Sequence, residues 1–176
     1  MELMERITLT VLAEFADLGQ LEQIVRTSLR LALAALLGAL LGFEREAKGK
    51  SAGLRTHMLV TMGAALFVMP LALSDASSDA VSRIVQGVAA GIGFLCAGTI
   101  LKGGKEDQVK GLTTAAGLWM STAIGIAVGL GHAATAVLGT FLALLVLHTL
   151  LLLEVRGKSD AKEEPQAAAK DDGEAG

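Results

Sequence analysis

The stretch from Gly111 to Leu153 reads GLTTAAGLWMSTAIGIAVGLGHAATAVLGTFLALLVLHTLLLL and contains no Asp, Glu, Lys or Arg in 43 residues. A membrane-spanning helix needs about 20 apolar residues, so this stretch is about twice as long as one span requires. It predicts two successive transmembrane helices with a tight turn between Gly129 and His132. Since an amphipathic helix of a soluble domain keeps a charged face, the stretch indicates a membrane protein.

The composition agrees with that location. Of the 176 residues, 52% are hydrophobic and the mean hydropathy is +0.57. Glycine is abundant, with 21 residues, and small residues let membrane helices approach closely. The first six residues, MELMER, carry acidic charges where a signal peptide would be basic, so we expect the first transmembrane helix to direct insertion and to remain.

The hydropathy pattern predicts an all-α, polytopic membrane protein with a compact bundle of five transmembrane helices. The expected spans are 28–43, 54–73, 84–101, 112–130 and 133–153, within a transmembrane domain over 28–154. Residues 1–27 are expected to form an amphipathic interfacial segment, with a short helix outside the membrane as the alternative. Residues 155–176 are charged and low in complexity, which predicts a disordered tail.

The distribution of basic residues predicts the orientation, because cytoplasmic loops carry an excess of Lys and Arg. Nine basic residues follow spans one, three and five, and three flank the membrane on the other side. The nine are Arg45, Lys48, Lys50, Arg55, Lys102, Lys105, Lys110, Arg156 and Lys158, and the three are Arg26, Arg30 and Arg83. We therefore expect the N-terminus outside and the C-terminal tail in the cytoplasm.

Glycine residues recur along the predicted spans and predict where helices pack. The candidates for helix packing are Gly38, Gly42, Gly87, Gly91, Gly93, Gly98, Gly117 and Gly125. Such spacing favours close helix contacts within the bundle and between copies, so a homo-oligomer is expected. The alternative is that the small residues leave room for a path or a cavity.

Polar residues gather at the predicted cytoplasmic ends of the spans, and polar groups inside a bilayer are functional candidates. We predict a cytoplasmic polar vestibule formed by Glu44, Arg45, Glu46, Arg55, Thr56, His57, Thr99, Thr113 and Thr114. The alternative is a salt-bridged rim, in which Thr56, Thr113 or Thr114 simply caps a helix.

The chemistry of the vestibule leaves its ligand open. Glu44 and Glu46 offer the oxygen ligands that Mg²⁺ prefers, so they are weak metal candidates, whereas Arg55 favours an anion. No cofactor is expected, and Mg²⁺ is the one possible ion. The sequence shows no nucleotide-binding pattern or catalytic set, which argues against an enzyme. Nucleic acid is not expected as a partner either, because the basic residues flank predicted membrane spans.

Four motifs resemble those of the MgtC/SapB family of bacterial inner-membrane proteins. They are LLGFERE at 40–46, AGLRTH at 52–57, GIGFLCAGTIL at 91–101 and VKGLTTAAGLW at 109–119. The resemblance covers about residues 28–154. It implies a short, YhiD-like form without the cytoplasmic domain that follows the fifth helix in better-studied members.

The resemblance also implies a link to growth at low magnesium and, in some members, to virulence. Many members are described as magnesium transporters, whereas the best-known member is regarded as a regulator of another membrane complex. From the one-sided polar residues we predict a non-enzymatic regulator of a membrane partner in magnesium-linked adaptation. The alternatives are a small transporter or channel for Mg²⁺ or another solute, and a structural assembly factor.

Overall fold

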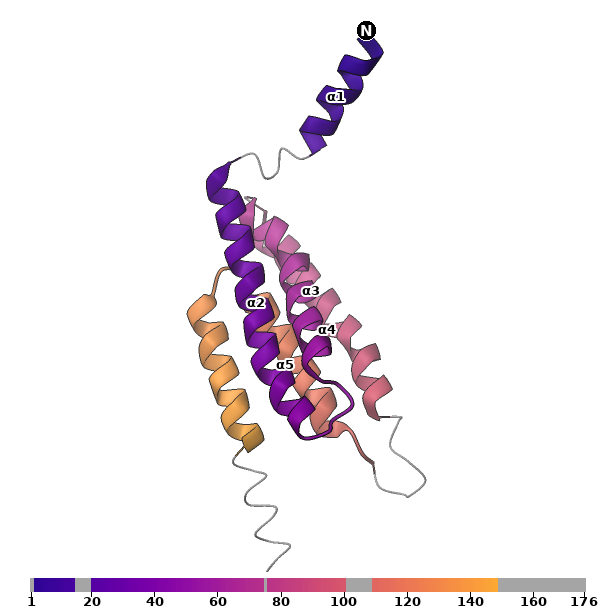
Figure 1. Ribbon diagram of the computed structural model, residues 1–176, viewed down its shortest axis with the longest axis vertical. Coiled ribbons are helices and arrows are strands. Elements are labelled where there is room, and N and C mark those ends of the chain that lie inside the picture. The colour runs from indigo at the N-terminus through magenta and orange to yellow at the C-terminus, as the bar shows by residue number, and fades with distance from the viewer. Residues whose placement is uncertain (1, 15–19, 75, 101–108, 149–176) are drawn as a thin grey trace, which may run out of the picture. The chain divides into compact units, whose positions relative to one another are not determined.

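The computed structural model describes residues 2–14, 20–74, 76–100 and 109–148, and every regular element in them is a helix (Figure 1). In chain order the helices are α1 (Glu2–Glu14), α2 (Leu21–Ala47), α3 (Leu54–Leu73), α4 (Ser78–Ile100) and α5 (Leu112–Gly129), followed by a helix over Ala133–His148. The all-α prediction is confirmed.

Four helices, α2 to α5, are long and apolar enough to cross a membrane. The Ala133–His148 helix corresponds to the predicted fifth span and is shorter over the residues that the structure describes. The rest of that predicted span and the predicted tail at 155–176 lie outside the described residues.

Two helices begin earlier than hydropathy predicts. α2 begins at Leu21 instead of residue 28, because polar residues extend its first turns: Arg26 pairs with Glu22 at 2.5 Å, one turn away. α4 begins at Ser78 instead of residue 84, and the Ser77 hydroxyl accepts a 3.3 Å hydrogen bond from the Ala80 N–H. A cap of this kind starts a helix without adding to its hydropathy.

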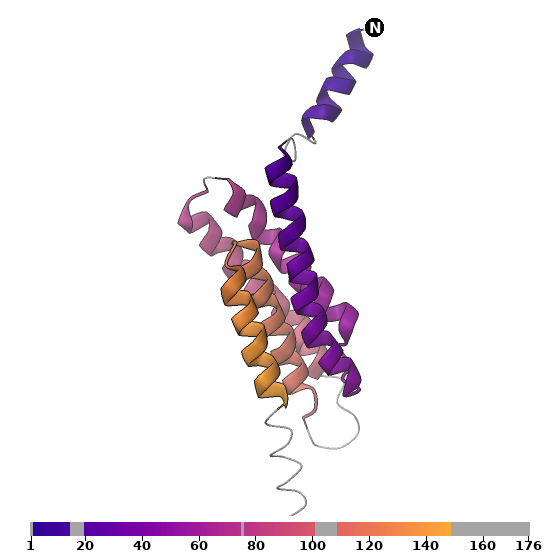
Figure 2. The same ribbon diagram turned by 60° about the vertical axis from the view of Figure 1, so that its left-hand side comes forward.

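Glycines bring α2, α3 and α5 into close contact within the compact unit formed by residues 1–140. A Cβ atom added to Gly42 of α2 would lie 2.6 Å from the Leu54 Cα of α3. A Cβ atom added to Gly129 of α5 would lie 2.6 Å from the Ala65 carbonyl oxygen of α3. Because only hydrogen fits at these positions, the backbones meet directly, and α2 lies alongside α3 and α5 in both views (Figures 1 and 2).

The glycines of α4 behave differently from those of α2 and α5. Cβ atoms added to Gly87, Gly91, Gly93 and Gly98 would meet nothing within 4 Å. The prediction that these four residues pack helices is therefore wrong for contacts among the described residues. The physical reason is rotation, because α4 contacts α5 with another face, from which the Cys96 thiol donates to the Ala115 carbonyl oxygen at 3.3 Å.

Candidate functional site

The polar site begins at the last turns of α2. Arg45 is buried, with 2% of its surface exposed, and its Nε donates to a carboxylate oxygen of Glu44. Lys48 forms an ion pair with the other carboxylate oxygen of Glu44. Because two cations hold this carboxylate, Glu44 acts as the centre of an ion-pair cluster.

Glu46 has a structural task of its own. Its Oε2 accepts a 2.8 Å hydrogen bond from the Leu54 N–H, the first N–H of α3. The N-cap position is Gly53, without a side-chain cap of its own, so the carboxylate reaches across from α2 to cap α3. The alternative that Thr56 caps this helix is therefore wrong.

The same correction applies to α5. Its N-cap is Gly111, whose φ of +96° is the left-handed conformation that glycine adopts most easily. No side-chain hydrogen bond caps this helix, so neither Thr113 nor Thr114 has the capping role offered as an alternative. Thr114 is instead buried at 3% exposure, and Thr113 is exposed.

His57 lies fully buried where α3 meets α5. Its Nδ1 is 3.0 Å from the Gly53 carbonyl oxygen, so Nδ1 carries a proton and donates it to that oxygen. Nε2 has no hydrogen-bond partner among the described residues, and a Cβ atom added to Gly117 of α5 would lie 3.4 Å from it. Ser121, one turn further along α5, is also fully buried, and its hydroxyl has no hydrogen-bond partner in the part of the chain that the structure describes. Buried polar atoms without a partner are uncommon in folded proteins. The contact between α3 and α5 contains two of them, His57 Nε2 and the Ser121 hydroxyl oxygen.

The structure divides the nine predicted vestibule residues into separate groups. Arg45, His57 and Thr114 are buried, and Thr113 is exposed. Glu44 pairs with Arg45 at the end of α2, whereas Glu46 caps the start of α3. The Thr99 hydroxyl donates to the Cys96 carbonyl oxygen at 2.8 Å within α4. Arg55 and Thr56 line a groove between α3 and α4 instead.

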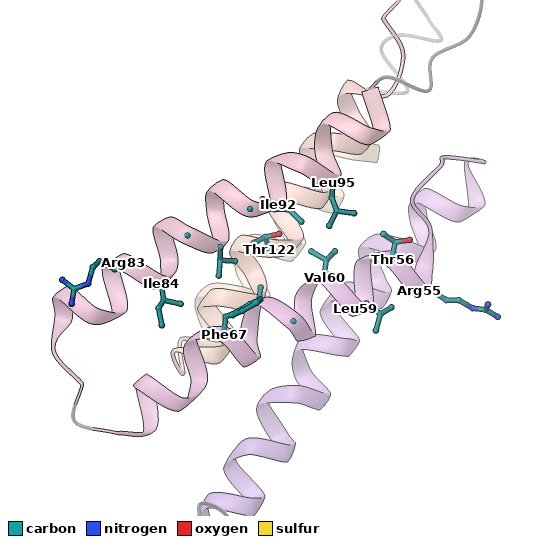
Figure 3. A pocket seen from close by; sticks show the side chains of 15 residues that line it. Arg55, Thr56, Leu59, Val60, Phe67, Arg83, Ile84, Ile92, Leu95 and Thr122 are labelled. Carbon is teal, nitrogen blue, oxygen red and sulfur yellow. The ribbon is translucent and has the colours of Figure 1, made fainter.

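This groove has a volume of about 910 Å³. Its walls are mainly apolar side chains such as Leu59, Val60 and Ile84, and Thr122 of α5 lies at its floor (Figure 3). Its size is at the upper end of the range for small-ligand pockets, about 300–1,000 Å³. Gly87 and Gly91 line the groove, in line with the alternative that small residues leave room for a cavity. The position of the groove was not predicted, because it depends on the separation of α3 from α4.

Buried hydroxyl groups escaped the sequence reasoning. Thr61, Thr122 and Thr140 are each 3% exposed or less, and each donates to the carbonyl oxygen four residues earlier at 2.9–3.0 Å. Such hydroxyls satisfy themselves within their own helix and so carry no visible pattern. In the sequence, these threonines are marked only by lying in stretches that contain no charged residue.

A metal centre finds no support in the described ranges. No three His, Cys, Asp or Glu side chains there lie close enough together to hold a metal ion. The weak metal candidates Glu44 and Glu46 are engaged by Arg45, Lys48 and the Leu54 N–H.

A model of the MgtC family matches residues 31–156, which is more than half of the chain. The chain belongs to the MgtC family. The resemblance of the four sequence motifs to this family is therefore confirmed. The four long apolar helices identify a membrane protein.

The chain is 48% identical to Protein SrpB of Synechococcus elongatus over 131 residues, which are 68% of this chain and 72% of SrpB. It is 40% identical to the Putative magnesium transporter YhiD of Escherichia coli K12 over 136 residues, 73% of this chain and 62% of YhiD. It is 46% identical to Protein MgtC of Salmonella typhimurium over 116 residues, 66% of this chain and 48% of MgtC. The chain thus spans about half the length of MgtC. No solved structure matches it.

Proposed function

We propose that this protein is a non-enzymatic, multi-pass protein of the bacterial inner membrane that binds and regulates another membrane protein during adaptation to low magnesium. Its N-terminus lies outside, and the nine basic residues that follow spans one, three and five face the cytoplasm. The link to magnesium rests on family membership and on the name of a relative, the Putative magnesium transporter YhiD.

The tightly packed core of α2, α3 and α5 is the observation that favours regulation over transport. Thr61 is fully buried between Gly38 of α2 and Gly125 of α5. A Cβ atom added to Gly38 would lie 2.7 Å from the His57 carbonyl oxygen, and one added to Gly125 would lie 2.9 Å from the Ala64 Cβ. Mg²⁺ loses its water shell reluctantly, so a layer without room for one methyl group disfavours passage through these three helices.

The residues beyond that layer support the same choice. Ala65, Val68 and Val128 are 0–1% exposed and fill the core with apolar side chains. The buried Arg45 and His57 lie on one side of the layer, and the half-buried Arg30 lies on the other, at Gly129, so these polar groups do not form a continuous path through it. A binding surface at one membrane face needs no continuous polar path, whereas a transporter does.

Transport of Mg²⁺ is the second candidate, and one observation favours it: a relative that is 40% identical bears the name Putative magnesium transporter. The ion-paired state of Glu44 and the capping role of Glu46 weigh against these carboxylates as an ion-binding mouth. For the purified protein in liposomes, regulation predicts no Mg²⁺ flux, whereas transport predicts Mg²⁺ flux.

The test measures Mg²⁺ entry into proteoliposomes that contain the purified full chain, with an established magnesium channel as the positive control. We expect no flux above that of empty liposomes. In parallel, the chain is expressed in a bacterium that lacks its own MgtC-family protein, and we expect growth at low magnesium to recover. Saturable flux that Glu44→Ala and Glu46→Ala both abolish would overturn regulation in favour of transport.

A further inference from the structure

The groove between α3 and α4 has open space beside three of the glycines that line it. Cβ atoms added to Gly63, Gly87 or Gly91, which all line the groove, would meet nothing within 4 Å. Ile92 is the one buried residue of α4. The groove is therefore wide and apolar beside α4.

An arginine stands at each end of the groove, because α3 and α4 run in opposite directions. Figure 3 shows Arg55 and Arg83 at opposite ends, with their side chains extending beyond the apolar wall. Both are exposed, and neither forms an ion pair with any residue that the structure describes. The groove thus combines an apolar middle with unpaired cationic ends.

The two ends differ in net charge. The sequence between residues 44 and 55, at the Arg55 end, contains four basic residues against the carboxylates of Glu44 and Glu46. The sequence between residues 74 and 83, at the Arg83 end, contains two Asp residues against Arg83 alone. An anionic group is therefore favoured at Arg55, where the Thr56 hydroxyl also faces the groove as a hydrogen-bond donor.

The length of the groove matches one lipid leaflet. Arg55 and Phe67 are twelve residues apart on α3, which is about 18 Å of helix. Half of a bilayer's hydrocarbon core is about 15 Å thick. An acyl chain that starts at Arg55 therefore reaches along the groove toward Phe67. Basic pockets between transmembrane helices are known to bind anionic lipid headgroups.

We infer that the α3–α4 groove binds an anionic phospholipid, with its phosphate at Arg55 and its acyl chains along the apolar wall toward Phe67. The occupant is held by charge at one end and by burial of apolar surface along the rest. The inference does not depend on the proposed function, since it rests on the lining and charge of the groove alone.

The test uses native mass spectrometry of the full chain in detergent, titrated with palmitoyl-oleoyl phosphatidylglycerol and, separately, with the matching phosphatidylcholine. We expect preferential binding of phosphatidylglycerol. Arg55→Gln should weaken it by about fivefold, the effect of one basic residue at an anionic lipid surface. Arg83→Gln removes the same charge from the other end and should change it less than twofold.

A second pair of variants tests the apolar part. Gly91→Leu places a side chain in the groove, whereas Gly93→Leu places it on α4 outside the groove, and neither Cβ meets another atom within 4 Å. We expect Gly91→Leu to abolish the preference for phosphatidylglycerol and Gly93→Leu to keep it.

Three outcomes would overturn the inference. The first is equal binding of both lipids by the unaltered protein. The second is unchanged binding in both Arg55→Gln and Gly91→Leu. The third is loss of a dimer in Gly91→Leu with unchanged lipid affinity, which would assign the groove to a second copy of the chain.

Discussion

Arg30 of α2 donates a 2.7 Å hydrogen bond from its guanidinium to the carbonyl oxygen of Gly129, at the end of α5 and 99 residues later. The last carbonyls of a helix have no partner within it, and an arginine that reaches them satisfies them and neutralises the helix end. The same guanidinium lies beside Gly131, where a Cβ atom would be 2.6 Å from its Nη2. One side chain thus fixes the turn after α5 against α2.

The Arg30 contact predicts a measurable loss of stability. Hydrogen bonds to charged groups contribute about 1.5–3 kcal/mol, so Arg30→Gln should lower the free energy of unfolding in mixed micelles by about that amount. Arg26→Gln is the matched control, because Arg26 forms an exposed one-turn ion pair, typically about 0.3–0.5 kcal/mol. Equal losses in the two variants would contradict a special role for Arg30.

Glycine positions in α2 and α4 should respond to alanine in opposite ways. Gly38→Ala should destabilise the protein by about 1–3 kcal/mol, because its methyl group would press on the His57 carbonyl of α3. Gly87→Ala meets open space and should stabilise it by about 0.5–1 kcal/mol through higher helix propensity. Thermal melting in detergent would measure both, and a stabilising Gly38→Ala would show that α2 and α3 are not in direct backbone contact.

Glu46 is expected to act on stability through the start of α3. Glu46→Ala removes the acceptor for the Leu54 N–H and should cost about 0.5–2 kcal/mol, the usual range for a lost helix cap. Glu46→Gln keeps an acceptor oxygen and should lose less. Isothermal titration with Mg²⁺ should not distinguish the variants, and a loss of Mg²⁺ binding in Glu46→Gln would instead indicate a metal ligand.

The proposed orientation can be checked with single cysteines on a Cys96→Ser background. Ser51 and Ser74 are both exposed, Ser51 between α2 and α3 and Ser74 at the end of α3. We expect a membrane-impermeant maleimide to label Ser74→Cys in intact spheroplasts and Ser51→Cys only after lysis. The reverse pattern would place the basic ends outside and invalidate the charge-based prediction.

The sequence by itself determined the helical, membrane-embedded character of the chain. Long runs without charge decide this locally, because each apolar segment must enter the bilayer and must satisfy its own backbone hydrogen bonds as a helix. The sequence also located the polar region that contains Arg45, His57 and Thr114. The order of the spans alone brings the ends of neighbouring helices to the same face of the membrane.

Tertiary structure alone decided which atoms meet. The sequence offered Glu46 as a metal ligand and Thr56 as a helix cap, but the cap is Glu46 itself. It placed Gly38 and Gly87 in one class, although one touches α3 and the other faces open space. The physical reason is that each of these contacts depends on the rotation and register of one helix against another, and hydropathy along the chain contains neither.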